Sequence, residues 1–202
     1  MAKATNADVK NNELSAEEVA QQYTGALVDK ALEAERVYAT YSQEQVDKIV
    51  AAMALAGSEA SLELAKEAHA ETGRGVVEDK DTKNHFATEY VYERIKNEKT
   101  VGIIGEDRVS GSIQIAAPLG VLAGIVPTTN PTSTTMFKIL VALKTRNAIV
   151  FAFHPQAQKC SAHAAKILYD AAVKAGAPEN IVQWIETPSI ANTTALIQNK
   201  KI

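Results

Sequence analysis

Apolar residues recur at helical spacing through the first hundred positions of the chain. Two capping-box patterns predict helix starts, one at Ser15 and one at Ser42. The same spacing predicts further helices over residues 59–71 and from about 78 to 95. Because amphipathic helices must bury their apolar faces, we expect this region to pack on itself or on the segment that follows.

The pattern changes near residue 100. Residues 100–117 hold two short β-branched runs around a turn-like stretch, which predicts a β-hairpin. From residue 118 onward, apolar runs alternate with amphipathic segments. The predicted strands are residues 119–126, 148–153 and 180–185, and the predicted helices are residues 132–144, 156–175 and 189–198. This order predicts an α/β fold in which a helical amino-terminal region and a hairpin precede a partial Rossmann-like parallel sheet with right-handed crossovers.

Composition narrows the class of protein. Hydrophobic residues make up 46% of the 202 positions, enough to build a core. The net charge of −3 argues against a nucleic-acid partner. The chain starts with polar residues, and its longest apolar stretch, residues 115–127, is too short to span a bilayer. We therefore expect a cytoplasmic protein with no membrane partner.

In an open parallel sheet, ligands bind beyond the carboxyl ends of the strands. That rule points to three loops, at residues 127–132, 154–156 and 186–189. The first loop packs hydroxyl and amide side chains between two prolines, directly before a predicted helix. Either it is a helix start capped by Thr132 or Ser133, or it is a loop that faces a nucleotide cofactor.

Other residues are weaker candidates for a binding or catalytic site. No glycine-rich dinucleotide fingerprint follows the first predicted strand. We expect Gly120 and Gly124, inside that strand, to permit close approach of a helix or of backbone. His154 is either a solvated strand-end histidine or a contact to the adenosine ribose. Cys160, the only cysteine, is expected to be a buried structural thiol. The histidines do not cluster in sequence, so no metal site is predicted.

A set of motifs then points to a family. They are Gly124-Ile-Val-Pro-Thr-Thr-Asn-Pro-Thr-Ser-Thr134, Leu143-Lys-Thr-Arg-Asn-Ala-Ile-Val150, Phe153-His-Pro155, Gly176-Ala-Pro178, Thr40-Tyr-Ser-Gln-Glu-Gln-Val-Asp-Lys48, Val77-Glu-Asp-Lys80 and Lys83-Asn-His-Phe86. Together they resemble the CoA-acylating branch of the aldehyde dehydrogenase superfamily. The likeness is to the amino-terminal part of its bifunctional members, in which this domain is fused to an iron-dependent alcohol dehydrogenase.

The resemblance implies an NAD-dependent oxidoreductase of ethanol fermentation. The reaction converts acetyl-CoA and NADH to acetaldehyde and CoA, reversibly, so NAD, CoA and acetaldehyde are the implied partners. Iron belongs only to the alcohol dehydrogenase part. The implied division is a helical region over residues 1–99 packing on the nucleotide-binding domain, oligomerisation strands over 100–117, and the first part of the NAD-binding domain over 118–202. A homo-oligomer is expected.

The resemblance also assigns residues. Those that match the nucleotide-contacting positions are Ile125, Val126, Pro127, Thr128, Thr129, Asn130 and His154, and either Asn130 or Thr129 is the candidate oxyanion contact. The family's phosphate loop and catalytic cysteine follow the segment matched here. We therefore expect a fragment without a catalytic residue of its own, inactive alone, with weak or absent NAD binding. The alternative is a non-catalytic association or binding module.

Overall fold

A computed structural model describes residues 14–202. The helices are α1 (Ala16–Tyr38), α2 (Gln43–Glu59), α3 (Ser61–Thr72), α4 (Val77–His85), α5 (Val91–Ile95), α6 (Pro131–Lys144), α7 (Gln158–Ala175) and α8 (Ile190–Ile197), with a π-helical turn η1 (Phe86–Tyr90) and a 3₁₀ turn η2 (Pro155–Ala157). The strands are β1 (Gly102–Asp107), β2 (Ser112–Ala116), β3 (Val121–Val126), β4 (Ala148–Phe153) and β5 (Val182–Trp184). None of the helices in this range is both long enough and apolar enough to cross a membrane.

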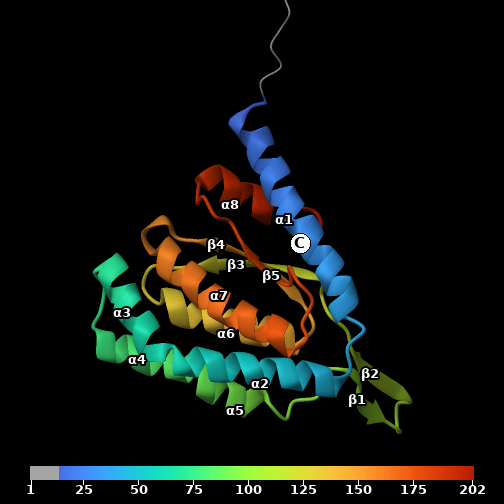
Figure 1. The fold of residues 1–202 in the computed structure, drawn as a ribbon. Coiled ribbons are helices and arrows are strands. Elements are labelled where there is room, and N and C mark those ends of the chain that lie inside the picture. The colour runs from blue at the N-terminus through green and yellow to red at the C-terminus, as the bar shows by residue number, and fades with distance from the viewer. Residues whose placement is uncertain (1–13) are drawn as a thin grey trace, which may run out of the picture.

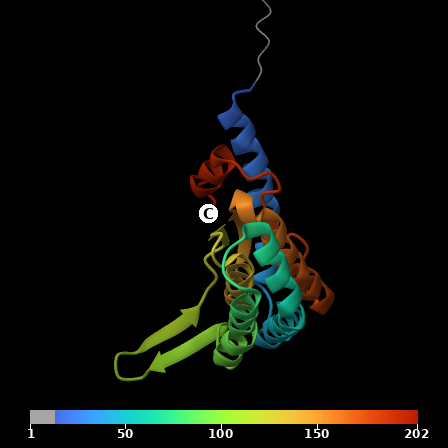
Figure 2. The same ribbon diagram turned by 90° about the vertical axis from the view of Figure 1, so that its left-hand side faces the viewer.

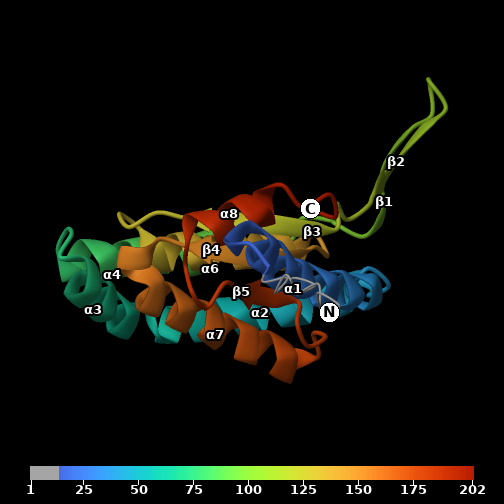
Figure 3. The same cartoon turned by 90° about the horizontal axis from the view of Figure 1, so that it is seen from above.

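The centre of the molecule is a parallel sheet in the order β3–β4–β5, as the alternating pattern predicts. Every residue of β4 is buried, because helices cover both faces of the sheet. Helices α6 and α7 pack on one face and α1 and α8 on the other (Figure 1). Helices α2 to α5 form a further layer outside α6 and α7 (Figure 1). In the view from above, α1 and α8 lie on the near side of the sheet (Figure 3).

Both predicted capping boxes are present. The Glu18 amide donates to the Ser15 hydroxyl at 3.2 Å, and the Ser15 amide donates to the Glu18 carboxylate at 2.8 Å. Ser42 and Gln45 repeat this arrangement at the start of α2. Each box satisfies amides that the first turn of a helix leaves without partners, so helix starts can be located from the sequence.

Several predicted boundaries differ from the structure for backbone reasons. Gly120 has a φ of 118° and lies before β3, so the prediction that it sits inside the strand is wrong. Asn180 has a φ of 66°, so the extended backbone of the predicted strand begins only after it, and β5 is three residues long. The predicted fourth helix is interrupted at residues 86–90, where the backbone widens into a π-helical turn.

The predicted hairpin is formed by β1 and β2, which pair antiparallel. It extends away from the helices and the parallel sheet (Figure 2). Its apolar side chains are therefore exposed: Ile113 and Ile115 are more than half exposed, and Val109 at the tip is almost fully so.

The turn after α6 joins the helical layer, the hairpin and the sheet. Arg146, in a left-handed conformation with φ of 60°, donates to the carbonyl of Ala39 after α1 and to that of Ala116 at the end of β2. The side-chain oxygen of Asn147 accepts from the amides of Leu119 and Gly120 at 2.6 and 3.0 Å. These bonds fix the path of the chain into β3.

The last residue of α6 adds a buried charge to this junction. The Lys144 ammonium lies 2.6 Å from an Asp47 carboxylate oxygen on α2, and it donates to the Lys96 carbonyl after α5 at 3.1 Å. The Lys144 carbonyl accepts from the Thr100 hydroxyl at 2.7 Å. A buried ammonium is stable only when it is paired and hydrogen-bonded in this way.

Gly124 shows where the core admits no side chain. A Cβ atom built there would lie 2.5 Å from the Phe151 ring, so the close approach at this glycine comes from a side chain of the neighbouring strand and not, as expected, from a helix or from backbone. We predict that Gly124→Ala lowers the free energy of unfolding by about 1–3 kcal/mol, because the Phe151 ring must shift within the core.

Gly25 in α1 provides the matched control for this substitution, because a Cβ atom at this position would have no neighbouring atom within 4 Å. Gly25→Ala should raise stability by about 0.5–1 kcal/mol through the gain in helix propensity. Urea unfolding of both variants checks the pair. Two shifts of the same sign would contradict the steric account of Gly124.

Candidate functional site

The predicted candidate loops follow β3, β4 and β5. Because the strands are parallel, their carboxyl ends lie along one edge of the sheet. The structure therefore brings residues 127–130, His154 with η2, and residues 185–189 to the same side of the molecule. The position of a ligand site in this fold class falls at that edge.

The loop between β3 and α6 presents a mixed surface. Pro127 and Thr129 are exposed, and Thr128 and Asn130 are half-buried. Ile125 is also exposed, whereas the Val126 side chain is 2% exposed, so Val126 offers a ligand only main-chain atoms. The loop thus displays a short run of side chains and backbone amides at the edge of the sheet.

Helix α6 begins without a side-chain cap. Asn130 occupies the N-cap position, but its amide makes no capping bond, and Pro131 follows it. The Thr132 hydroxyl instead donates to the Asn84 side chain at 2.8 Å. The alternative expectation of a helix start capped by Thr132 or Ser133 is therefore wrong, and the polar groups of the loop are not used for capping.

Helix α4 is hydrogen-bonded to this loop and to the start of α6. The Lys80 ammonium donates to the Thr129 carbonyl at 3.3 Å, and Asn84, one turn further on, accepts from Thr132. Glu78 and Asp79, next to Lys80 in the first turn of α4, are exposed, whereas Lys80 is only 5% exposed. Burial, and then the charge of Lys83, lower the pKa of Lys80.

A pocket of about 440 Å³ opens beside the loop. Its lining is mostly apolar on the α4–α5 side and polar at the start of α6, and consists of Lys83, Phe86, Ala87, Val91, Asn130, Ser133, Thr134 and Phe137. Phe86 stacks on Tyr90 across the π-helical turn, with ring centroids 5.8 Å apart. Sequence reasoning missed this pocket. Aromatic residues at exposed positions of a polar helix were the available signal.

His154 ends β4 and is exposed. Its Nδ1 accepts from the Gln156 amide at 3.1 Å, which caps the 3₁₀ turn η2. The rest of the imidazole faces solvent at the carboxyl edge of the sheet. The geometry is thus compatible with both predicted interpretations, a solvated strand-end histidine and a ribose contact.

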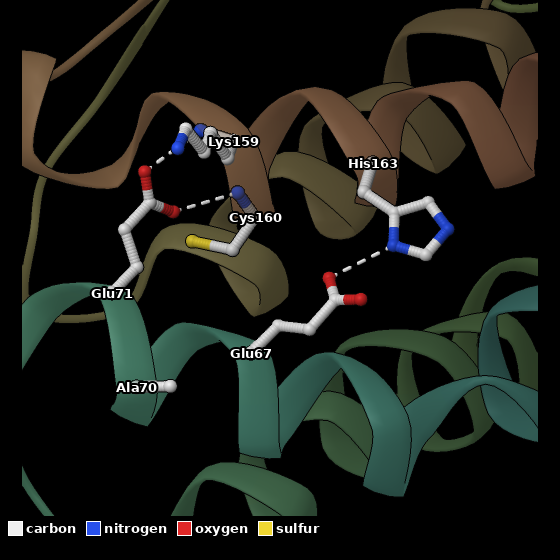
Figure 4. Close-up of a pocket in the computed structure, with 6 residues that line it drawn as sticks. All are labelled: Glu67, Ala70, Glu71, Lys159, Cys160 and His163. Atoms are coloured by element: carbon white, nitrogen blue, oxygen red, sulfur yellow. Dashed lines mark hydrogen bonds and ion pairs between the residues drawn. The ribbon is translucent and has the colours of Figure 1, made fainter.

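Cys160 is buried, as expected for a structural thiol, at 1% exposure in the first turn of α7. The Glu71 carboxylate on α3 accepts from the Lys159 and Cys160 amides at 2.9 and 2.7 Å (Figure 4). Glu71 therefore caps α7 from another helix. Burial, and then the Glu71 carboxylate, raise the pKa of Cys160 to about 12, so its thiol is protonated near neutral pH.

The pKa of the Glu71 carboxyl shifts in the opposite direction, downward. Burial alone would raise its pKa, but the amide donors of Cys160 and Lys159 outweigh burial and lower it. Next to it, His163 pairs with Glu67 at 2.8 Å, and these residues line a pocket of about 510 Å³ between α3 and α7 (Figure 4). Its polar groups are engaged in holding the two helices together.

The remaining histidines lie apart from the loop edge. His85 contacts the Glu89 carboxylate at 3.0 Å on the surface of α4 and η1, and His69 lies on α3. Over residues 14–202, no three metal-ligating side chains come together as a group that could hold an ion.

The geometry agrees with comparisons to known proteins. The model of the aldehyde dehydrogenase family matches residues 6–202. The bifunctional aldehyde-alcohol dehydrogenase AdhE of Escherichia coli K12 is 52% identical over 177 residues, which cover 88% of this chain and 20% of that protein. The chain thus spans about a fifth of the length of this relative.

Solved structures extend the likeness to three dimensions. An acetylating aldehyde dehydrogenase from Geobacillus thermoglucosidasius superimposes with a TM-score of 0.89 at 45% identity, covering 93% of this chain and 42% of that one. An engineered glycolyl-CoA reductase with bound NADP⁺ superimposes with a TM-score of 0.75 at 28% identity, covering 89% and 40% of the two chains. Sequence and fold agree: the chain belongs to the aldehyde dehydrogenase family.

Proposed function

We propose that this chain is the amino-terminal segment of an NAD-dependent, CoA-acylating acetaldehyde dehydrogenase, which interconverts acetyl-CoA with NADH and acetaldehyde with CoA. The observation that carries the proposal is the pocket beside the 127–130 loop, in a chain whose relatives are acylating aldehyde dehydrogenases. A mostly apolar pocket with a few polar groups at one end suits a short acyl chain with a single carbonyl.

The residues at the sheet edge suit one end of a dinucleotide. The exposed loop residues and His154 would hold the cofactor, with Val126 contributing main-chain atoms. When bound, NAD supplies or accepts the hydride. Residues 14–202 offer few free amides to a pyrophosphate, because Glu71 accepts from the Lys159 and Cys160 amides of α7 and Pro131 removes one from the start of α6.

We assign the oxyanion contact to Asn130, with Thr129 as the alternative. Asn130 lines the pocket. Among residues 14–202, its side-chain amide has one contact, at 3.5 Å with the Thr129 hydroxyl, which leaves it able to donate to a carbonyl oxygen. A donor fixed where negative charge develops lowers the barrier to acyl transfer.

The nucleophile of the reaction is not in this chain. Acyl transfer through a thioester needs a thiolate at the reacting carbon. Cys160 is buried and protonated, and it lines the α3–α7 pocket, not the pocket beside Asn130. We propose that the catalytic cysteine, and an iron-dependent alcohol dehydrogenase that completes ethanol fermentation, lie in further parts of a cytoplasmic parent protein.

The proposed division of labour follows the elements. The predicted helical region over residues 1–99, of which residues 1–13 lie outside the described part, supplies helices that pack on the nucleotide-binding part. Residues 118–202 begin that part, and residues 100–117 serve oligomerisation. The projecting hairpin supports the last assignment, because the described part of one copy of the chain leaves its isoleucines exposed. The alternative, a non-catalytic association module, rests on the same hairpin, and the next experiments separate the two.

We predict that NAD binds this chain with a dissociation constant of about a millimolar or weaker, because the described residues give the pyrophosphate few donors. Calorimetric titration measures it. Any residual binding should fall in a Thr129→Ala, Asn130→Ala double variant and survive changes to the hairpin. Micromolar affinity, or binding indifferent to the double variant, would contradict the proposed cofactor loop.

We predict no CoA-dependent oxidation of acetaldehyde by the 202-residue chain, and no change on Cys160→Ala. The assay follows NADH appearance with acetaldehyde, CoA and NAD, and a full-length acylating aldehyde dehydrogenase serves as the positive control. Turnover that disappears in Cys160→Ala would show that this thiol is the nucleophile, against both its burial and its raised pKa.

We predict that the chain self-associates, because β3 has one unpaired edge in the sheet and the hairpin exposes apolar side chains. Light scattering across a concentration series measures the mass. Replacing Ile113 and Ile115 by serine should weaken association at least about tenfold, through the loss of buried apolar area. Ile197→Ser, at an exposed site on α8, is the matched control. A monomer at high concentration would refute the prediction.

A further inference from the structure

Lys80 occupies a position that is costly for a lysine. It is 5% exposed, and it lies in the first turn of α4, where the helix dipole disfavours a positive charge. The ion pairs found among residues 14–202 do not include it. A methionine would fill the same volume without this cost, so packing does not explain the ammonium.

The acceptor of the Lys80 ammonium lies in the candidate loop. It is the Thr129 carbonyl, at 3.3 Å, and that carbonyl belongs to the same peptide unit as the Asn130 amide. In a planar trans peptide the C=O and N–H bonds point in opposite directions. The bond from Lys80 therefore points the Asn130 N–H away from the Lys80 ammonium, and Asn130 lines the pocket beside the loop. Within the described residues, this amide donates to no other group.

We infer that Lys80 is a positioning residue, which orients and polarises the Thr129–Asn130 peptide so that the Asn130 backbone amide donates to the carbonyl oxygen of a ligand in the adjacent pocket. The inference rests on the proposed function for the identity of that ligand, an acyl or aldehyde carbonyl. A positive charge behind a peptide carbonyl strengthens the N–H on its far side as a donor. Lys80 thus acts through the peptide, not on the ligand.

The experiment follows the Asn130 amide by NMR in the 202-residue chain and titrates acetamide as an unreactive carbonyl probe. The variants are Lys80→Met, which keeps the volume, and Lys80→Arg, which keeps the charge. Lys138→Met is the matched control, because Lys138 is also partly buried and donates to a main-chain carbonyl, that of Ile125, at 2.6 Å. Thermal unfolding of each variant reports global stability.

Lys80→Met should weaken acetamide binding at the Asn130 amide about tenfold, the equivalent of one hydrogen bond. The order parameter of that N–H should fall from a rigid value of about 0.85 toward about 0.6, while the melting temperature stays or rises. Lys80→Arg should restore both readouts, and Lys138→Met should leave them unchanged. An unchanged order parameter in Lys80→Met, or a fall spread over the whole chain with loss of stability, would overturn the inference.

The two proposals fail in different ways. If acetamide does not move the Asn130 amide in the unsubstituted chain, the proposed pocket is wrong as a carbonyl site. The order parameter still decides whether Lys80 orients the peptide, because that readout needs no ligand.

Discussion

The turn after α6 is the constraint on which the rest of the structure depends. The last residue of α6, Lys144, supplies a buried ammonium, and the turn supplies the guanidinium of Arg146, whose backbone is left-handed, and the side-chain amide of Asn147. Each of these groups bonds to a different part of the chain. Lys144 ties the turn to α2, Arg146 ties it to the end of α1 and to the hairpin, and Asn147 sets the entry into β3. Because those groups have few other partners in the interior, a different packing of the helices would leave charges buried and unpaired. The sheet edge that carries the candidate site is aligned by this junction.

Local signals in the sequence account for much of the fold. A capping box pairs a serine with a glutamate or glutamine three residues later, and a buried strand such as residues 148–153 is an unbroken apolar run. Both signals depend on neighbours within one turn or one strand, so they can be recognised without tertiary information. The strand at residues 182–184 begins later than the predicted residue 180 because Asn180 adopts a left-handed conformation. The boundary at Gly120 has a similar cause, because its φ of 118° accompanies the hydrogen bond from its amide to the Asn147 side chain. Residue propensities alone do not predict these backbone conformations, because they are set by tertiary contacts.

The candidate site was predictable only in part. The rule that ligands lie at the carboxyl ends of parallel strands finds the 127–130 loop and His154 from the order of elements alone. The support beneath the loop comes from α4, some fifty residues earlier in the chain, and Lys80 looks there like any surface lysine among acids. The pocket wall at Phe86 depends on the π-helical turn, which no periodic pattern announces. A site built from two segments far apart in the sequence can be recognised only when the contact between them is known.

The cap that Glu71 gives to α7 has a consequence for the order of folding. The first turn of α7 has no side-chain cap of its own, and its carboxylate partner lies 88 residues earlier in the chain. The Tyr38 hydroxyl reaches the Leu143 carbonyl across 105 residues, and the Gln183 amide reaches the Leu27 carbonyl across 156. Contacts of such long range form only after large loops have closed, which slows folding. During synthesis, Glu71 leaves the ribosome before α7 does, but the cap forms only when the loop of 88 residues between Glu71 and Lys159 has closed.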